Sequence, residues 1–135
     1  NDISLFDGIL PMLADLKARN YVLAVATGKS RRGLNDVLKT SELQGLFHAS
    51  RTADETAGKP HPLMLQELMD EFGVPAQRVL MVGDTTHDLQ MALNAGCHSV
   101  GVSYGAHEPA AFAALKPLFV AHTVPELRAW FAEHG

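Results

Sequence analysis

Short apolar runs of strand length alternate along this chain with segments of helical periodicity, and this alternation constrains the fold more than any other feature. The runs Tyr21–Ala26 (YVLAVA) and Val79–Val82 (VLMV) are almost wholly apolar, which favours strands buried on both faces. Helical segments separate the runs, with connections of about two to eight residues. The pattern predicts an α/β layered domain with a mainly parallel sheet.

The expected elements follow from periodicity and from start and stop signals. The expected helices are Asp7–Arg19, Ser30–Thr40, Leu63–Phe72, His87–Ala95, Pro109–Leu115 and a C-terminal helix to about Glu133. The expected strands are Tyr21–Ala26, Leu46–Arg51, Val79–Val82, Ser99–Val102 and Leu118–Ala121. Thr123 and Glu126 are spaced as a capping box for the last helix. Two prolines in Gly58–Pro62 predict an extended loop.

Composition narrows the class of protein. The 135 residues, 47% of them hydrophobic, suit one domain with its own core. The net charge of −4, without a Lys/Arg cluster, argues against nucleic acid as a partner. One cysteine, Cys97, excludes an internal disulfide framework and favours either a reducing compartment or indifference to redox. We expect a cytoplasmic location. No apolar run reaches transmembrane length, so no membrane partner is expected.

In parallel α/β sheets, ligands bind at the carboxyl ends of the strands. After the first apolar run come Thr27, Gly28, Lys29 and Ser30. A hydroxyl, a glycine and a helix N-terminus together suit a phosphate cradle. The alternative is an ordinary strand-to-helix turn in which Ser30 is the N-cap. A nucleotide-binding Walker A loop is excluded, because Leu23 stands where its first glycine is required.

Two further sites follow along the chain. Lys59, in the proline-stiffened loop, is either a cation held to neutralise an anion or a solvated loop residue. Asp84 and Asp88 follow the second apolar run at the start of a helix, and two carboxylates there suit Mg²⁺. Alternatively, Asp84 is an N-cap and Asp88 complements the helix dipole. We interpret Cys97 as a small core residue. Three histidines could be metal ligands, but no two of them have His-x3-His spacing, so we interpret them as surface or loop residues: His61, His87 and His98.

The order of these sites resembles motifs II, III and IV of the haloacid dehalogenase (HAD) superfamily. The segments LFDGILPMLADLKARNYVLAVATGKS and KPHPLML…VLMVGDTTHDLQMALNAGCHSVGVSYG resemble its phosphoglycolate phosphatase-like hydrolases with a helical cap. The resemblance covers nearly the whole chain. It implies a three-layer Rossmann-like HAD core with a mainly parallel sheet.

The resemblance also implies roles for individual residues in a Mg²⁺-dependent phosphatase that acts on small phosphate monoesters. Thr27 would hydrogen-bond the transferring phosphoryl group, helped by the Gly28 amide. Lys59 would bridge that group and a nucleophilic carboxylate. Asp84 would bind Mg²⁺, and Asp88 would complete or support the metal site. The nucleophile would form an aspartyl-phosphate that water hydrolyses.

The family's motif I, Asp-x-Asp-Gly-Thr, supplies that nucleophile and has no match here. The segment from Leu5 to Gly8 imitates its tail, but Leu5 stands at the nucleophile's place, so Asp7 receives no catalytic role. We therefore expect residues 1–135 to be the C-terminal, post-cap portion of a HAD core, a fragment of a longer protein. It would lack the cap and the first, central strand, which lies between the strand before Thr27 and the strand before Asp84.

The sequence leaves two other interpretations open. The chain on its own could be inactive, acting as a phosphate-binding, metal-binding or interaction module. A fragment without its central strand could also close the gap by re-pairing strands or by dimerising. A receiver-like signalling domain is disfavoured, because it requires the order Asp, Thr, Lys, whereas this chain has Thr27, Lys59 and then Asp84.

Overall fold

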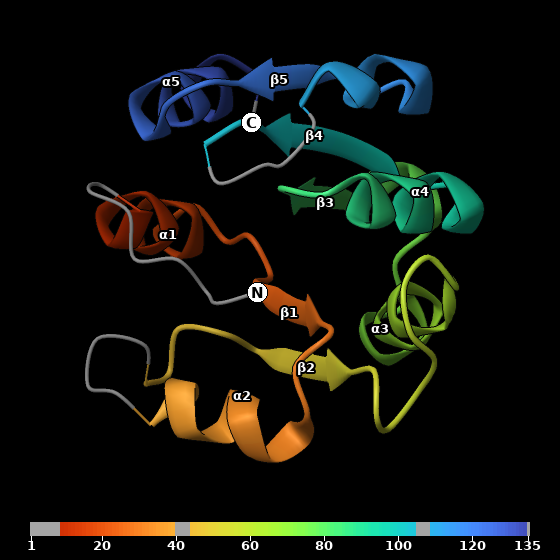
Figure 1. The fold of residues 1–135 in the computed structure, drawn as a ribbon. Helices are drawn as coiled ribbons and strands as arrows, with labels where there is room; N and C mark the ends of the chain where they lie inside the picture. Colours follow the sequence, from red (N-terminus) through yellow and green to blue (C-terminus); the bar gives the residue numbers. More distant parts are fainter. Residues whose placement is uncertain (1–8, 40–43, 105–108, 135) are drawn as a thin grey trace. The chain divides into compact units, whose positions relative to one another are not determined.

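The computed structural model describes residues 9–39, 44–104 and 109–134. The chain divides into two compact units, Asn1–Gly58 and Lys59–Gly135. Helices and strands alternate in both, and the described strands form two parallel sheets, one in each unit (Figure 1). The predicted α/β class with parallel pairing is confirmed. The strand before Thr27 and the strand before Asp84, between which the resemblance places a further strand, belong to different sheets.

The first unit is a two-stranded parallel sheet with two helices. Its elements are α1 (Ile9–Ala18), β1 (Ala24–Thr27), α2 (Arg31–Leu38) and β2 (Ala49–Thr52). The register places Thr27 opposite Thr52, so both strands end at the same edge. Ser30 caps α2, as the alternative interpretation of this turn expects, because its hydroxyl accepts a hydrogen bond from the Gly33 amide at 3.1 Å. Leu34, on the inner face of α2, is fully buried.

The apolar run before Thr27 is less buried than its composition indicates. β1 begins at Ala24, and Val22, ahead of it, is 51% exposed. Among the described strands, β1 pairs with β2 alone. The prediction of a strand buried on both faces is therefore wrong here, because such burial requires neighbours that these residues do not provide.

The second unit is a three-stranded parallel sheet in the order β3-β4-β5, with helices packed on it. Its strands are β3 (Leu80–Gly83), β4 (His98–Val102) and β5 (Phe119–Ala121). Its helices are α3 (Leu63–Phe72), η1 (Ala76–Arg78), α4 (Thr86–Ala95), η2 (Pro109–Leu115) and α5 (Val124–His134). α4 packs on β3 and β4, and α5 packs on β5. Its core includes Met64, Leu89, Met91, Val100, Phe112 and Leu127. Each such buried side chain stabilises the fold by about 1.5–3 kcal/mol.

Three details of this unit differ from the sequence predictions. Val82 in β3 is 39% exposed rather than buried, since among the described strands β3 pairs with β4 alone. The segment Pro109–Leu115 is a 3-10 helix. At α5, Thr123 Oγ1 accepts from the Glu126 amide at 3.2 Å, but the Glu126 carboxylate accepts from the His122 amide at 3.0 Å. The Thr123 half of the expected capping box therefore forms. The Glu126 carboxylate binds the His122 amide instead of the Thr123 amide.

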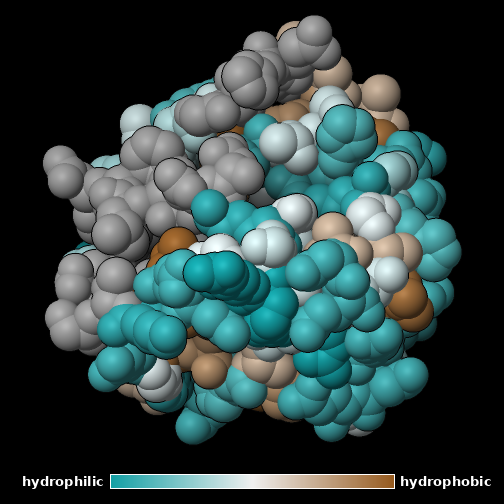
Figure 2. Space-filling view, turned by 60° about the horizontal axis from the view of Figure 1, so that its bottom comes forward, coloured by the Kyte–Doolittle hydropathy of each residue, from teal (hydrophilic) through white to brown (hydrophobic). Residues whose placement is uncertain are grey.

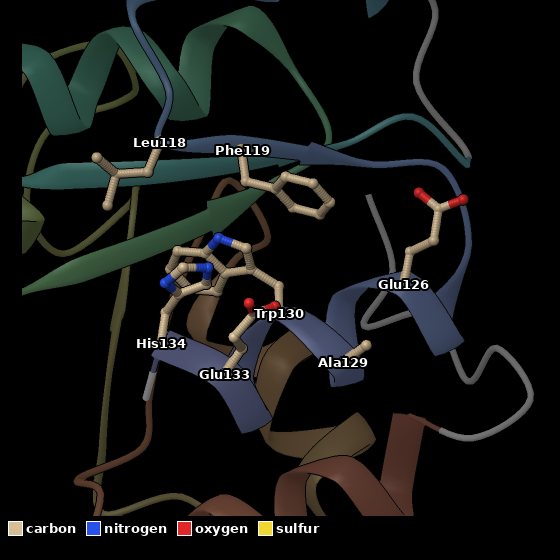
Figure 3. Close-up of a pocket in the computed structure, with 7 residues that line it drawn as sticks. All are labelled: Leu118, Phe119, Glu126, Ala129, Trp130, Glu133 and His134. Carbon is tan, nitrogen blue, oxygen red and sulfur yellow. The ribbon is translucent and has the colours of Figure 1, made fainter.

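The surface shown in Figure 2 is mostly hydrophilic, and its hydrophobic residues lie in small separate patches. A shallow pocket lies between β5 and α5, where Phe119 and Trp130 stack with ring centroids 6.2 Å apart (Figure 3). Its lining contains none of the predicted site residues. Within the described part of the chain, no helix is both long and apolar enough to cross a membrane.

Candidate functional site

Thr27 ends β1 at the carboxyl edge of the first unit's sheet and is 7% exposed. Its Oγ1 accepts a hydrogen bond from the Lys29 amide at 3.1 Å, which closes a tight turn. Because a hydroxyl carries one proton as well as lone pairs, Thr27 can still donate to an anion. The space beside Gly28 is open, since a Cβ built there would meet nothing within 4 Å. This turn can therefore receive a ligand oxygen.

Lys59 opens the second unit and its ammonium is held by Asp88. The Nζ donates to Oδ1 of Asp88, and the two side chains are 18% and 6% exposed. The predicted extended loop is instead a turn with a cis Lys59–Pro60 peptide bond. Asn94 of α4 ties this turn down by donating to the Pro60 carbonyl at 3.0 Å. Lys59 is thus a fixed, largely buried cation, and the alternative of a solvated loop residue is excluded.

Asp88 organises the loop between β3 and α4. Its Oδ2 accepts from the amides of Asp84 and Thr85, each at 3.2 Å, while Thr85 Oγ1 accepts from the Asp88 amide at 3.1 Å. These bonds form a capping box in which Thr85 is the N-cap of α4. The alternative that Asp84 is the N-cap is therefore wrong. Both carboxylate oxygens of Asp88 are engaged within the second unit.

Gly83 makes this arrangement sterically possible. A Cβ at position 83 would lie 2.3 Å from Asp88 Cβ and 2.8 Å from Asp88 Cγ. Any larger residue would push Asp88 out of its place under the loop. Sequence reasoning assigned no role to Gly83 or Thr85. The signal for Thr85 was present, because Thr-x-x-Asp ahead of an apolar helical segment predicts a capping box.

Asp84 is the carboxylate of this loop whose charged form is disfavoured by burial. Loss of hydration raises the pKa of Asp84 above its ordinary value of 3.8, and the negative charge of Asp88 raises it further. The positive charge of Lys59 opposes this effect. Two neighbouring carboxylates, one of them with a raised pKa, suit a divalent cation, which prefers oxygen ligands. The described residues hold no cluster of three or more His, Cys, Asp or Glu side chains arranged for a metal ion.

The predicted site residues thus fall into two groups. Lys59, Asp84 and Asp88 come together at the carboxyl end of β3, whereas Thr27 and Gly28 lie in the first unit. Asp7 lies outside the described residues. Cys97 is buried as predicted, and burial raises the pKa of its thiol. The three histidines interpreted as surface residues are all exposed: His61, His87 and His98.

A charged network in the first unit was not predicted. Arg31 Nε donates to Glu55 Oε1 at 2.8 Å, and the Arg31 amide donates to Asp54 at 3.1 Å. Thr52, fully buried at the end of β2, donates to Asp54 Oδ1 at 2.5 Å. No local signal marks this network, because its members lie on segments that only the pairing of β1 with β2 brings together.

Comparison with known proteins places these features in a family. Residues 1–102 match the family model described as haloacid dehalogenase-like hydrolase. The chain belongs to this family. It is 39% identical over 123 residues to "Probable phosphatase IndB" of Dickeya dadantii, covering 90% of this chain and 54% of that protein. It is 36% identical over 102 residues to a phosphoglycolate phosphatase of Mannheimia succiniciproducens, covering 75% of this chain and 46% of that protein.

Solved structures agree with the HAD fold. The crystal structure of a predicted phosphoglycolate phosphatase from Haemophilus somnus superposes with a TM-score of 0.83 at 30% identity. The match covers 93% of this chain and 57% of that one. The chain therefore spans about half the length of the HAD proteins that it matches.

Proposed function

We propose that the protein hydrolyses small phosphate monoesters with Mg²⁺ through an aspartyl-phosphate. The observation that carries the proposal is the placement of Lys59 and Asp88 in one buried ion pair directly beneath Asp84 and its loop. A fixed ammonium and a strained carboxylate at the carboxyl end of a parallel strand suit a phosphate dianion and a divalent cation. Relatives named as phosphatases support the same chemistry.

Each residue proposed for the reaction has one task. The Thr27 hydroxyl and the Gly28 amide donate hydrogen bonds to the oxygens of the phosphoryl group. Lys59 neutralises part of its charge. Asp84 is the direct metal ligand, because Asp88 already engages both of its oxygens; Asp88 supports the site by holding Lys59 and the Asp84 loop. Bound Mg²⁺ would supply further positive charge to the phosphate oxygens.

The remaining component of the proposed mechanism is the nucleophile, which none of these residues provides. In the reaction that the family resemblance implies, a carboxylate oxygen bonds to phosphorus as the ester P–O bond breaks, and the alcohol leaves with a proton. Water then attacks phosphorus, releases inorganic phosphate and restores the carboxylate. The 135 residues contain no Asp-x-Asp pair, so the proposal places the nucleophile on a segment outside this sequence.

The absence of an Asp-x-Asp pair also favours a second function for the 135 residues taken alone. In that case the chain binds phosphate or a divalent cation without turning a substrate over. Self-association of such a chain and a cytoplasmic location stay predictions. The two functions differ in their outcomes, because the first requires turnover once the nucleophile is supplied.

The test uses Mg²⁺-dependent hydrolysis of p-nitrophenyl phosphate by the intact protein. Asp84→Asn is expected to lower kcat/KM at least about hundredfold, whereas Asp70→Asn, an exposed position on α3, leaves it unchanged. A wild-type rate in Asp84→Asn would overturn the metal assignment. The 135-residue chain is expected to show Mg²⁺ binding by calorimetry but no turnover, and clear turnover would contradict the external nucleophile.

A further inference from the structure

The N-terminus of α2 already binds a carboxylate side chain of this protein. The Arg31 amide, the first of the helix, donates to both carboxylate oxygens of Asp54, each at 3.1 Å. First-turn amides lack partners within their own helix and are the donors that usually bind phosphate. Asp54 reaches this position from the segment after β2, because the parallel register brings the ends of β1 and β2 together.

Other groups around this helix start are also engaged. The Gly33 amide donates to Ser30 Oγ and the Lys29 amide to Thr27 Oγ1, both at 3.1 Å. Gly28, by contrast, is exposed and has open space beside it. The loop therefore offers a ligand its Thr27–Gly28 end, while its helical end is occupied.

The guanidinium of Arg31 binds neighbouring side chains of the protein and not the phosphate loop. Its Nε donates to Glu55 Oε1 at 2.8 Å, and its Nη1 donates to Ser50 Oγ at 2.7 Å. The buried Thr52 hydroxyl lies between the carboxylates of Asp54 and Glu55, at 2.5 and 3.2 Å. Two acids, one arginine and one hydroxyl thus fasten the start of α2 to the end of β2.

We propose that Asp54 is a positioning residue that excludes phosphate from the N-terminus of α2 and thereby directs it to Thr27 and Gly28. A phosphate at the Arg31 amide would have to displace the Asp54 carboxylate and would meet its negative charge. The inference rests on the proposed function, which assigns phosphate to this loop. It goes beyond that function because it explains why phosphate binds at Thr27 and Gly28, at the start of the loop, and not at the N-terminus of α2, at the end of the loop.

The test titrates the ¹⁵N-labelled chain with inorganic phosphate and follows backbone amide shifts. In the wild type, the Gly28 amide is expected to move and the Arg31 amide to stay. In Asp54→Ala, the Arg31 amide is expected to move as well. Asp54→Asn, whose carbonyl can still accept from Arg31, is expected to restore the wild-type pattern, and Asp36→Ala, an exposed change on α2, is the matched control.

An Arg31 shift in the wild type, or none in Asp54→Ala, would overturn the inference. A Gly28 amide that ignores phosphate, together with an Arg31 response gained in Asp54→Ala, would overturn the proposed function and the directing role of Asp54, while its exclusion of phosphate from α2 would stand. The wild type supplies a measurement that does not depend on a variant folding. Its Arg31 amide should exchange with solvent about tenfold or more slowly than the Arg32 amide, and equal rates would also overturn the inference.

Discussion

Lys59 and Asp88 form an ion pair in which the ammonium holds one carboxylate oxygen while two loop amides hold the other. The pair therefore joins the turn that opens the second unit to the loop that presents Asp84. Partners that lie 29 residues apart in sequence act here as one structural element. The consequence of this pairing can be measured on the free energy of unfolding.

Removing the Asp88 carboxylate should destabilise the folded chain. Asp88→Ala is expected to lower the free energy of unfolding by about 2–3 kcal/mol, because it leaves a largely buried ammonium and two loop amides without their acceptor. Urea denaturation followed by circular dichroism measures this change. Asp70→Ala, an exposed position on α3, should stay within about 0.5 kcal/mol of wild type. Equal stability of the two variants would refute the structural role of Asp88.

Gly83 should tolerate no side chain. Gly83→Ala places a Cβ 2.3 Å from Asp88 Cβ, so Asp88 must move and lose its loop contacts. A loss of about 1–3 kcal/mol is expected in the same denaturation experiment. Gly28→Ala is the control, since its Cβ would meet open space. If the two alanine variants proved equally stable, the close approach of Asp88 to Gly83 would be wrong.

The contribution of Asp54 to stability should depend on pH. Hydrogen bonds from Thr52 and from the Arg31 amide lower the pKa of Asp54 below its ordinary value of 3.8. The unfolded chain then binds this proton at a higher pH than the folded chain does. The stabilisation is thus complete above pH 3.8 and is lost as the pH falls through the folded pKa. The stability difference between wild type and Asp54→Asn, measured by urea denaturation across this window, should shrink toward acid. A difference that stays constant would contradict the shift.

Cys97 should be unreactive in the folded chain. Its thiol is buried beside Met69 Sδ at 3.9 Å, and burial raises its pKa, so little thiolate forms near neutral pH. We expect 5,5′-dithiobis(2-nitrobenzoic acid) to react at least about tenfold more slowly with the folded chain than with the chain in urea. Comparable rates in the two states would show that the thiol is accessible.

Local sequence patterns predicted most of the elements and the identity of the site residues. The bounds of α3, the Ser30 cap and the end of α4 at Ala95 were all expected from the sequence, since each depends on a few neighbouring residues. Gly96 has the positive φ of 76° that this position favours for glycine. The exposure of Val82 was not predicted, because a strand's burial depends on which strands lie beside it.

The sequence by itself therefore determined the alternation of strands and helices, the HAD family and the candidate residues Thr27, Lys59 and Asp84. The tertiary structure decided how charges pair: Lys59 with Asp88, and the Arg31 amide with Asp54. Periodicity and capping act over a few residues and can be read along the chain. The Arg31 amide meets Asp54 across 23 residues because β1 and β2 are parallel and end at one edge of their sheet. Lys59 meets Asp88 across 29 residues because α4, which carries Asp88, also holds the Lys59 turn through Asn94 and the Pro60 carbonyl.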